Sequence, residues 1–92
     1  DYRRRGLDST PDFGFVLTVY GGFLTEKGDF ASADAYFRKA EAIFRERFYP
    51  THLWLGDNLR NQGISLYLQN NFVEARVKID EAKRIYLESF GK

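Results

Sequence analysis

The side chains that could support catalysis or bind a metal are few and scattered along this chain. It has one histidine, His52, and no cysteine, so it lacks the residues for a histidine or thiolate metal site. Asp80, Glu81 and Glu88 lie among lysines and arginines, a pattern typical of a charged outer helix face with i,i+4 pairs. The sequence shows no phosphate-binding glycine loop and no catalytic triad. We therefore expect no enzymatic activity, no metal and no cofactor.

The basic run Arg3, Arg4 and Arg5 is the candidate for contact with nucleic acid. The formal net charge is only +1, and no aromatic side chains alternate with the arginines, so a solvated helix face is the better interpretation. His52 is more typical of a turn or a helix start than of a catalytic group. We expect a protein or peptide as partner, and neither nucleic acid nor membrane.

The composition indicates one small, ordered domain. The 92 residues are 43% hydrophobic and 17% aromatic, which separates the chain from disordered sequences. There is no signal peptide and no apolar run of about 20 residues that could span a bilayer. The lack of cysteine fits a reducing compartment, so we expect a cytoplasmic location. Because the chain begins at Asp1 without an initiator Met, it reads as a piece of a longer protein.

The sequence repeats itself at an offset of 42 residues. The identical pairs include Leu17 and Leu59, and Gly21 and Gly63, at helical spacing. The others are Gly14/Gly56, Leu24/Leu66, Phe30/Phe72, Ala33/Ala75, Ala40/Ala82, Ile43/Ile85, Glu46/Glu88 and Phe48/Phe90. The repeat predicts two units of the same structure, residues 7–48 and residues 49–90.

Each unit is expected to hold two amphipathic helices, at about 11–27 and 30–47 and at about 52–69 and 72–90. In the first unit Thr10 is the expected N-cap and Pro11 takes the first helical position, while Gly28 ends the helix in a left-handed backbone and Asp29 caps the next helix. By the same register, residues 1–6 are expected to end the helix of a preceding repeat. Residues 91–92 are expected to begin a turn to a following one.

In the second unit Thr51 or His52 is expected to open the first helix. Asn70 stands where the first unit has Gly28, and asparagine is the next best residue for a left-handed backbone. Asn71 and Glu74 have the spacing of a capping box.

The recurring small residues indicate close helix packing. Gly21 and Gly63 should let the first helix of each pair approach the second, where Ala33 and Ala75 face the contact. Ala40 and Ala82 should let neighbouring units stack. A glycine inside a helix costs about 0.5–1 kcal/mol relative to alanine, so its recurrence argues for a steric need. We therefore expect Gly63→Leu to loosen the second unit.

These residues resemble the tetratricopeptide repeat family. The pattern Leu-x-x-x-Gly-x-x-Leu, a turn, Phe-x-x-Ala and a later Ala runs through both units, from Leu17 to Ala40 and from Leu59 to Ala82. The usual repeat has 34 residues, and a period of 42 is similar to the longer variant of kinesin light chains and many bacterial signalling proteins. The resemblance implies an all-α fold of tandem antiparallel helix pairs that form a short right-handed α-solenoid.

In this family the first helices of the pairs line a concave groove that holds a peptide or a helix. The resemblance therefore implies groove positions on both first helices. They are Phe15, Thr18, Val19, Gly22, Thr25 and Glu26, and Asp57, Arg60, Asn61, Ile64, Tyr67 and Leu68. Asn61 is expected to bond a ligand backbone, Arg60 a carboxylate, and Tyr67 to offer apolar area and a hydroxyl. Val19 replaces the family's asparagine in the first unit, so no basic clamp for a C-terminal carboxylate is evident.

Other roles for these residues remain open at this stage. Asn61 and Arg60 could be solvated surface residues, and Asp57 could pair with either of them. The aromatics, Trp54 included, are expected mainly in the core or between the units, although an exposed Trp54 could anchor a partner.

A protein-binding scaffold is thus the expected function. The alternative is a regulatory or oligomerisation region of a larger signalling protein, such as a bacterial serine/threonine kinase or an ATPase. Nucleic-acid binding ranks lower. Two units without flanking repeats would expose apolar ends, so self-association through these ends is also expected.

Overall fold

The computed structural model describes residues 10–48 and 52–90, which form four α-helices. α2 spans Pro11–Glu26, α3 spans Phe30–Arg47, α4 spans Leu53–Leu68 and α5 spans Phe72–Phe90. The predicted helix limits agree with these bounds to within one residue, and the described residues contain no strand. The predicted tail at 1–6, Thr51 as a possible helix start and the turn at 91–92 lie outside the described residues.

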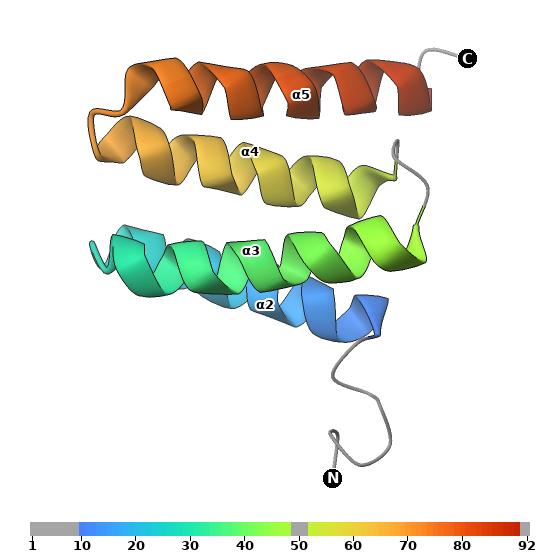
Figure 1. The fold of residues 1–92 in the computed structure, drawn as a ribbon, viewed down its shortest axis with the longest axis horizontal. Coiled ribbons are helices and arrows are strands. Elements are labelled where there is room, and N and C mark those ends of the chain that lie inside the picture. The colour runs from blue at the N-terminus through green and yellow to red at the C-terminus, as the bar shows by residue number, and fades with distance from the viewer. Residues whose placement is uncertain (1–9, 49–51, 91–92) are drawn as a thin grey trace, which may run out of the picture.

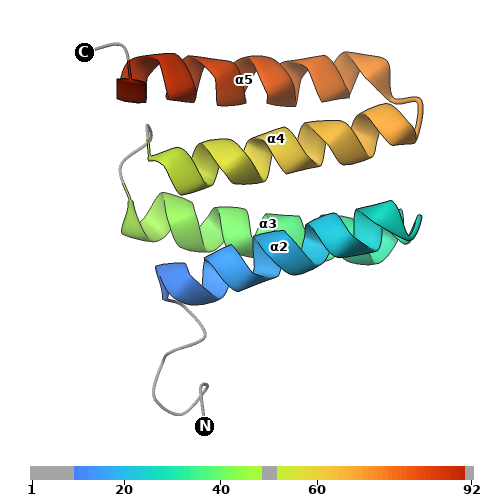
Figure 2. The ribbon, with the colours of Figure 1, turned by 180° about the vertical axis from the view of Figure 1, so that it is seen from behind.

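The helices form two antiparallel pairs, unit 1 with α2 and α3 and unit 2 with α4 and α5. In Figure 1, α4 lies between α3 and α5, while α2 lies behind α3. The view from behind in Figure 2 shows α2 in front of α3. This arrangement confirms the predicted all-α helical repeat.

The backbone repeats with the same 42-residue offset as the sequence. α2 and α4 have bounds exactly one offset apart, and so do the first residues of α3 and α5, Phe30 and Phe72. Gly28 and Asn70, one offset apart, both have positive φ, at 84° and 65°. This is the left-handed conformation that the sequence predicts for both turns.

The predicted caps are present at three helix starts. Thr10 Oγ1 accepts from Phe13 N at 3.3 Å, and Asp29 Oδ1 accepts from Ser32 N at 3.3 Å. His52 starts α4, with Nδ1 accepting from Trp54 N at 3.1 Å. These bonds satisfy backbone N–H groups that have no partner inside the helix.

The capping box expected before α5 takes a different form. Asn71 Nδ2 donates to the carboxylate Oε1 of Glu74 at 3.4 Å, so the two side chains bond to each other. In a capping box each side chain would instead bond the backbone N–H of the other residue. The prediction of that motif was therefore wrong, although the two residues do meet.

The glycines act as the packing argument requires. A Cβ added to Gly21 would lie 2.6 Å from Cε1 of Phe37, and one added to Gly63 would lie 2.6 Å from Cδ1 of Ile79. Phe37 and Ile79 are themselves one offset apart. In each unit a glycine on the first helix therefore packs directly against a large side chain on the second helix.

Between the units, Ala40 and Ala82 lie in one buried cluster, as predicted for stacking. Its other buried members are Leu17, Ile43, Phe44, Leu55, Leu59 and Ile85. The cluster takes residues from all four helices, so the two units share one hydrophobic core.

A chain of hydrogen bonds crosses the joint beside this core. Asn58 is fully buried, and its Nδ2 lies 3.0 Å from Thr18 Oγ1 and 3.1 Å from the carbonyl oxygen of Phe37. Gln62 Nε2 donates at 2.7 Å to Asn58 Oδ1 and at 2.7 Å to Glu41 Oε1.

The chain continues along α3 to α5. The carboxylate of Glu41 accepts from Arg45 Nε at 2.8 Å, and Arg45 reaches Glu81 at 3.2 Å. Burial pushes the pKa of Glu41 upward, but the bonds from Gln62 and Arg45 outweigh it, so the pKa lies below its ordinary value. The carboxylate of Glu41 is thus held ionised at the joint.

Candidate functional site

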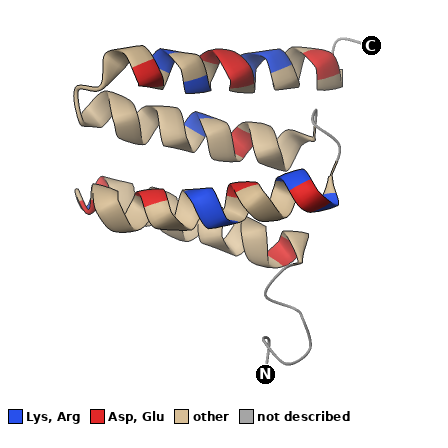
Figure 3. Cartoon of the chain, viewed as in Figure 1, with Lys and Arg blue, Asp and Glu red and all other residues tan. Residues whose placement is uncertain are grey.

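Charge is distributed unevenly between the two kinds of helix (Figure 3). α2 carries only Asp12 and Glu26, and α4 carries only Asp57 and Arg60. α3 and α5 carry many charges, with i,i+4 pairs such as Arg38–Asp34 and Arg84–Glu88, as predicted for an outer face. A surface formed by α2 and α4 is therefore poor in charge.

A groove of about 560 Å³ lies between α2 and α4. It is lined by every groove residue inferred from the resemblance except Tyr67. From α2 these are Phe15, Thr18, Val19, Gly22, Thr25 and Glu26; from α4 they are Asp57, Arg60, Asn61, Ile64 and Leu68. The fold thus brings together residues that are about 40 positions apart in the sequence.

Large hydrophobic side chains on both walls of the groove are exposed. Phe15, Val19 and Phe23 on α2, and Ile64 and Leu68 on α4, are between 39% and 58% exposed. Gly22 leaves the space between the walls open, since a Cβ added there would meet only Asn61 Oδ1, at 3.6 Å. The groove is therefore apolar along both sides and open at its middle.

Three lining residues were not predicted as groove positions: Phe23, Phe44 and Trp54. Phe23 is four residues after Val19 and Trp54 is three residues before Asp57, so helical spacing could have found both. Phe44 belongs to α3 and packs against Gly14, where an added Cβ would lie 2.8 Å from its ring. The missing side chain of Gly14 was the sequence signal for this contact.

Trp54 forms one end of the groove within a group of aromatic rings. Its ring centroid lies 5.0 Å from that of Phe15, 6.1 Å from Phe44 and 5.9 Å from Phe48. Trp54 is half-buried. It therefore packs between the units, as predicted, and part of its surface also lines the groove.

Thr18 and Thr25 contribute walls but not free hydroxyls. Both are buried, and each hydroxyl donates to the carbonyl four residues earlier, at 3.0 Å to Gly14 and at 2.9 Å to Gly21. The Thr18 hydroxyl also accepts the bond from Asn58. Neither hydroxyl can donate to a ligand without breaking a buried bond.

The polar centre of the groove is largely bonded internally. The Tyr86 hydroxyl donates to Asp57 Oδ1, and Asn61 Nδ2 donates to the Asp57 carbonyl oxygen at 2.9 Å. Burial raises the pKa of Tyr86 and the bond to Asp57 raises it further, while Arg60 partly offsets both. Asp57 is therefore held by Tyr86, which sequence reasoning had assigned mainly to packing. Arg60 is the exposed cation of the groove.

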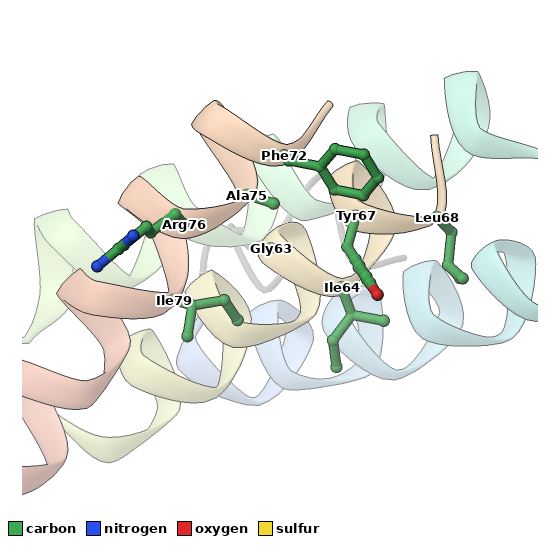
Figure 4. A pocket seen from close by; sticks show the side chains of 8 residues that line it. All are labelled: Gly63, Ile64, Tyr67, Leu68, Phe72, Ala75, Arg76 and Ile79. Carbon is green, nitrogen blue, oxygen red and sulfur yellow. The ribbon is translucent and has the colours of Figure 1, made fainter. Parts of the chain in front are cut away.

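Tyr67 lies elsewhere, which corrects its assignment to the groove. Its ring contacts Phe72 of α5, with centroids 5.2 Å apart. Both residues line a separate hollow of about 490 Å³ between α4 and α5 (Figure 4). The physical reason is that the bulky ring at this position packs toward α5, whereas Thr25, one offset earlier, is small enough to stay beneath the groove.

Within 10–48 and 52–90, no three His, Cys, Asp or Glu side chains gather where they could hold a metal ion. Over the same ranges, each helix is too short or too polar to cross a membrane. The groove offers apolar contact and the Arg60 cation to a bound molecule.

Comparison with known proteins gives a family match. A family model described as the tetratricopeptide repeat matches residues 15–88, which cover nearly all of the four helices. Searches of curated proteins and of solved structures each found no match.

Proposed function

Because the chain belongs to the tetratricopeptide repeat family, whose repeats generally mediate protein–protein interaction, we propose that its groove binds an apolar segment of a partner protein. The groove meant here is the one between α2 and α4, from Trp54 to Leu68. The proposal makes the chain a binding module without catalytic activity. A cytoplasmic location is part of the same proposal.

One observation carries this proposal: five large hydrophobic side chains are exposed on the two walls of a single groove. Such a concentration is costly in water, since apolar burial stabilises by about 25 cal/mol per Å². Contiguous apolar patches on soluble proteins usually mark interaction sites. A partner that covers Phe15, Val19, Phe23, Ile64 and Leu68 removes this cost.

The polar groups of the groove favour a helical segment over an extended one. An extended peptide needs partners for its backbone N–H and C=O groups, whereas a helix satisfies them internally. Thr18, Thr25 and the amide nitrogen of Asn61 are already bonded within the protein. An amphipathic helix with apolar residues at i, i+3, i+4 and i+7 therefore suits the groove best. An acidic residue on its flank would meet Arg60.

The period supports a finer assignment within the family. The bounds of α2 and α4, the first residues of α3 and α5, and the left-handed turn residues recur at 42 residues, longer than the usual 34. We propose that the chain represents the longer variant similar to that of kinesin light chains and bacterial signalling proteins. A regulatory role within a larger signalling protein is compatible with the same groove.

The test is to fill the groove without disturbing the fold. Gly22→Leu places a side chain between the walls, where only Asn61 Oδ1 is near, and it replaces glycine with a good helix former. A displayed library of amphipathic helical peptides would be selected on the wild-type protein. The selected peptides should shift the fluorescence of Trp54, the only tryptophan of the chain, when they bind the wild-type protein. They should not bind the Gly22→Leu variant.

The matched control is Ala42→Leu, which adds similar bulk at an exposed position of α3. It should bind the selected peptides as tightly as the wild type. If Gly22→Leu binds them equally well, the site lies outside the groove. If the only binders are extended sequences that contain proline, the helical ligand is ruled out while the groove remains.

A further inference from the structure

The two units of this chain are equivalent in structure but not in surroundings. In unit 1, Phe37 is only 1% exposed, because α4 covers the α2–α3 pair on that side. Ile79, one offset later in unit 2, is 36% exposed. Among the described residues, no helix covers unit 2 as α4 covers unit 1.

We call this uncovered surface the open side of unit 2. It is the hollow of about 490 Å³ in Figure 4. Its apolar side chains, all at least partly exposed, are Ile64, Tyr67, Leu68, Phe72 and Ile79. The joint between the two units shows what fits such a surface: a helix in the position of α4.

The other end of the molecule carries a matching helix. α4 covers unit 1 with Asn58, Gln62 and Ser65, all buried. One offset earlier, α2 has Val16, Tyr20 and Phe23 at the same positions, and Val16 is 57% exposed. With Phe15 and Val19 these residues line a further apolar hollow of about 510 Å³. We call this surface the outer side of α2.

The two surfaces differ from the internal joint at matched positions. At the joint, Gln62 bonds Glu41, and Arg45 pairs with Glu81. On the two open surfaces the residue that corresponds to Gln62 is Tyr20, on the outer side of α2. The residue that corresponds to Glu41 is Lys83, in unit 2. In the second pair, Lys39 of unit 1 corresponds to Glu81, and Leu87 of unit 2 corresponds to Arg45.

In the first replaced pair, the ring of Tyr20 can contact the lysine ammonium group. In the second, the aliphatic stem of Lys39 can pack against Leu87. At the joint Asn58 donates to the Phe37 carbonyl oxygen, and the matched residues one offset away are Val16, which has no side-chain donor, and Ile79. At the first two matched positions an aromatic or apolar side chain on one surface thus faces a lysine on the other.

We propose that a second copy of this chain docks the outer side of its α2 on the open side of unit 2, in the place that α4 takes against unit 1. The contact continues the internal joint from one molecule to the next. It is head to tail, so each molecule uses two different surfaces. A pair of molecules still has one surface of each kind unfilled, and association proceeds beyond the dimer.

One matched position opposes the contact and offers a test of its register. At the joint, the rings of Trp54 and Phe15 lie 5.0 Å apart. One offset away these positions are Asp12 and Asp57, which the head-to-tail contact places near each other. Asp12→Asn removes this like-charge pair and should strengthen association, most clearly at low salt.

The main experiment uses two exposed positions that lie outside the binding groove. Val16→Glu places a charge on the outer side of α2, and Tyr67→Glu places one on the open side of unit 2. Sedimentation velocity would be measured for the 92-residue chain over a range of concentrations. The wild type should grow with concentration past the dimer, while each variant alone should stay monomeric.

The decisive measurement is an equal mixture of the two variants. Val16→Glu keeps an intact open side of unit 2 and Tyr67→Glu keeps an intact α2, so the mixture should form a one-to-one dimer and stop there. A wild type that stays monomeric overturns the proposal. So does a variant that dimerises alone, because it would show a symmetric contact between like surfaces.

One further variant and one control measurement separate this result from other causes. Gly22→Leu fills the peptide groove and should associate like the wild type, so failure of the proposed function would not affect this test. Helicity by circular dichroism should match the wild type in both charged variants. If either one unfolds, Val16→Lys or Tyr67→Lys replaces it in the same mixing experiment.

Discussion

Gly21 and Phe37 are packed so closely that the glycine has room for its hydrogen only, since an added Cβ would lie 2.6 Å from the ring. The neighbouring Gly22 faces the open groove. We expect Gly21→Ala to destabilise the fold by about 1–3 kcal/mol through overpacking. Gly22→Ala should stabilise it by about 0.5–1 kcal/mol, because alanine favours a helix. Denaturant unfolding of the two variants would check this opposite response.

Gly63→Ala makes the equivalent change in unit 2 and should cost less than Gly21→Ala. The atom nearest to the added Cβ is the end of the Ile79 side chain, which is partly exposed and can move aside, whereas Phe37 is enclosed. Gly63→Leu should still loosen unit 2, since the Ala75 carbonyl oxygen would be 3.1 Å from the added Cβ. Unchanged melting temperatures for all these variants would contradict the packing account.

Asn58→Asp should be the most damaging single-atom change at the joint. It removes the donor to Thr18 and to the Phe37 carbonyl and places a charge at a fully buried position. We expect a loss of about 3 kcal/mol or more at neutral pH. The loss should shrink at acid pH, as the new carboxyl is protonated. Asn61→Asp on the same helix is half-exposed and should cost under about 1 kcal/mol in the same denaturation experiment.

Glu41 should contribute to loss of stability in acid. Its pKa is lowered in the folded protein, because the bonds from Gln62 and Arg45 outweigh burial. The contribution is therefore complete above the ordinary value of 4.5 and is lost as the pH falls through the lowered folded value. Glu41→Gln should be less stable at neutral pH and should show a weaker fall below 4.5. Glu46→Gln, at an exposed position, should retain the wild-type profile in thermal melts.

His52 should make the start of α4 sensitive to pH. Its Nδ1 accepts the bond from Trp54 N, which requires the unprotonated nitrogen, and burial lowers its pKa below 6.5. The stability from this cap is complete above 6.5 and is lost as the pH falls through the lowered value. His52→Asn retains a capping side chain without titrating, so its melting temperature should vary less between pH 7 and pH 5. An equal pH dependence in both proteins would exclude the cap as the cause.

Much of the fold could be predicted because its rules are local. Thr10, Asp29, Gly28 and Asn70 act at single turns, and their residue types alone favour the conformations observed. Once the offset of 42 was found, each unit also supported the interpretation of the other. Local signals repeated in register are the kind that sequence reasoning detects best.

The buried polar chain was missed because it depends on contacts between distant residues. Asn58 and Gln62 look like surface residues by type, and only their helical spacing with Leu55 and Leu59 places them on the buried face. Their partners, Thr18, Glu41 and the carbonyl of Phe37, belong to the other unit. Which groups pair across a joint is decided by tertiary packing.

The groove was placed on the correct helices, while the roles of individual residues were less predictable. Every position but Tyr67 lines it, yet Thr18 and Thr25 are occupied by internal bonds and Asp57 is held by Tyr86. Spacing tells which face of a helix a residue lies on. It does not tell whether a polar group on that face already has a partner inside the protein.

The bond from Asn58 to Thr18 has a consequence for ligand selection, because it links α4 and α2, the helices that form the two walls of the groove. It acts as a strut that holds the walls at one spacing, and the shared core prevents them from sliding. The distance between the two walls should therefore stay the same when a ligand binds. Segments would be sorted by thickness before any specific contact is made, and small side chains would be accepted where a bulky residue of equal hydrophobicity is refused.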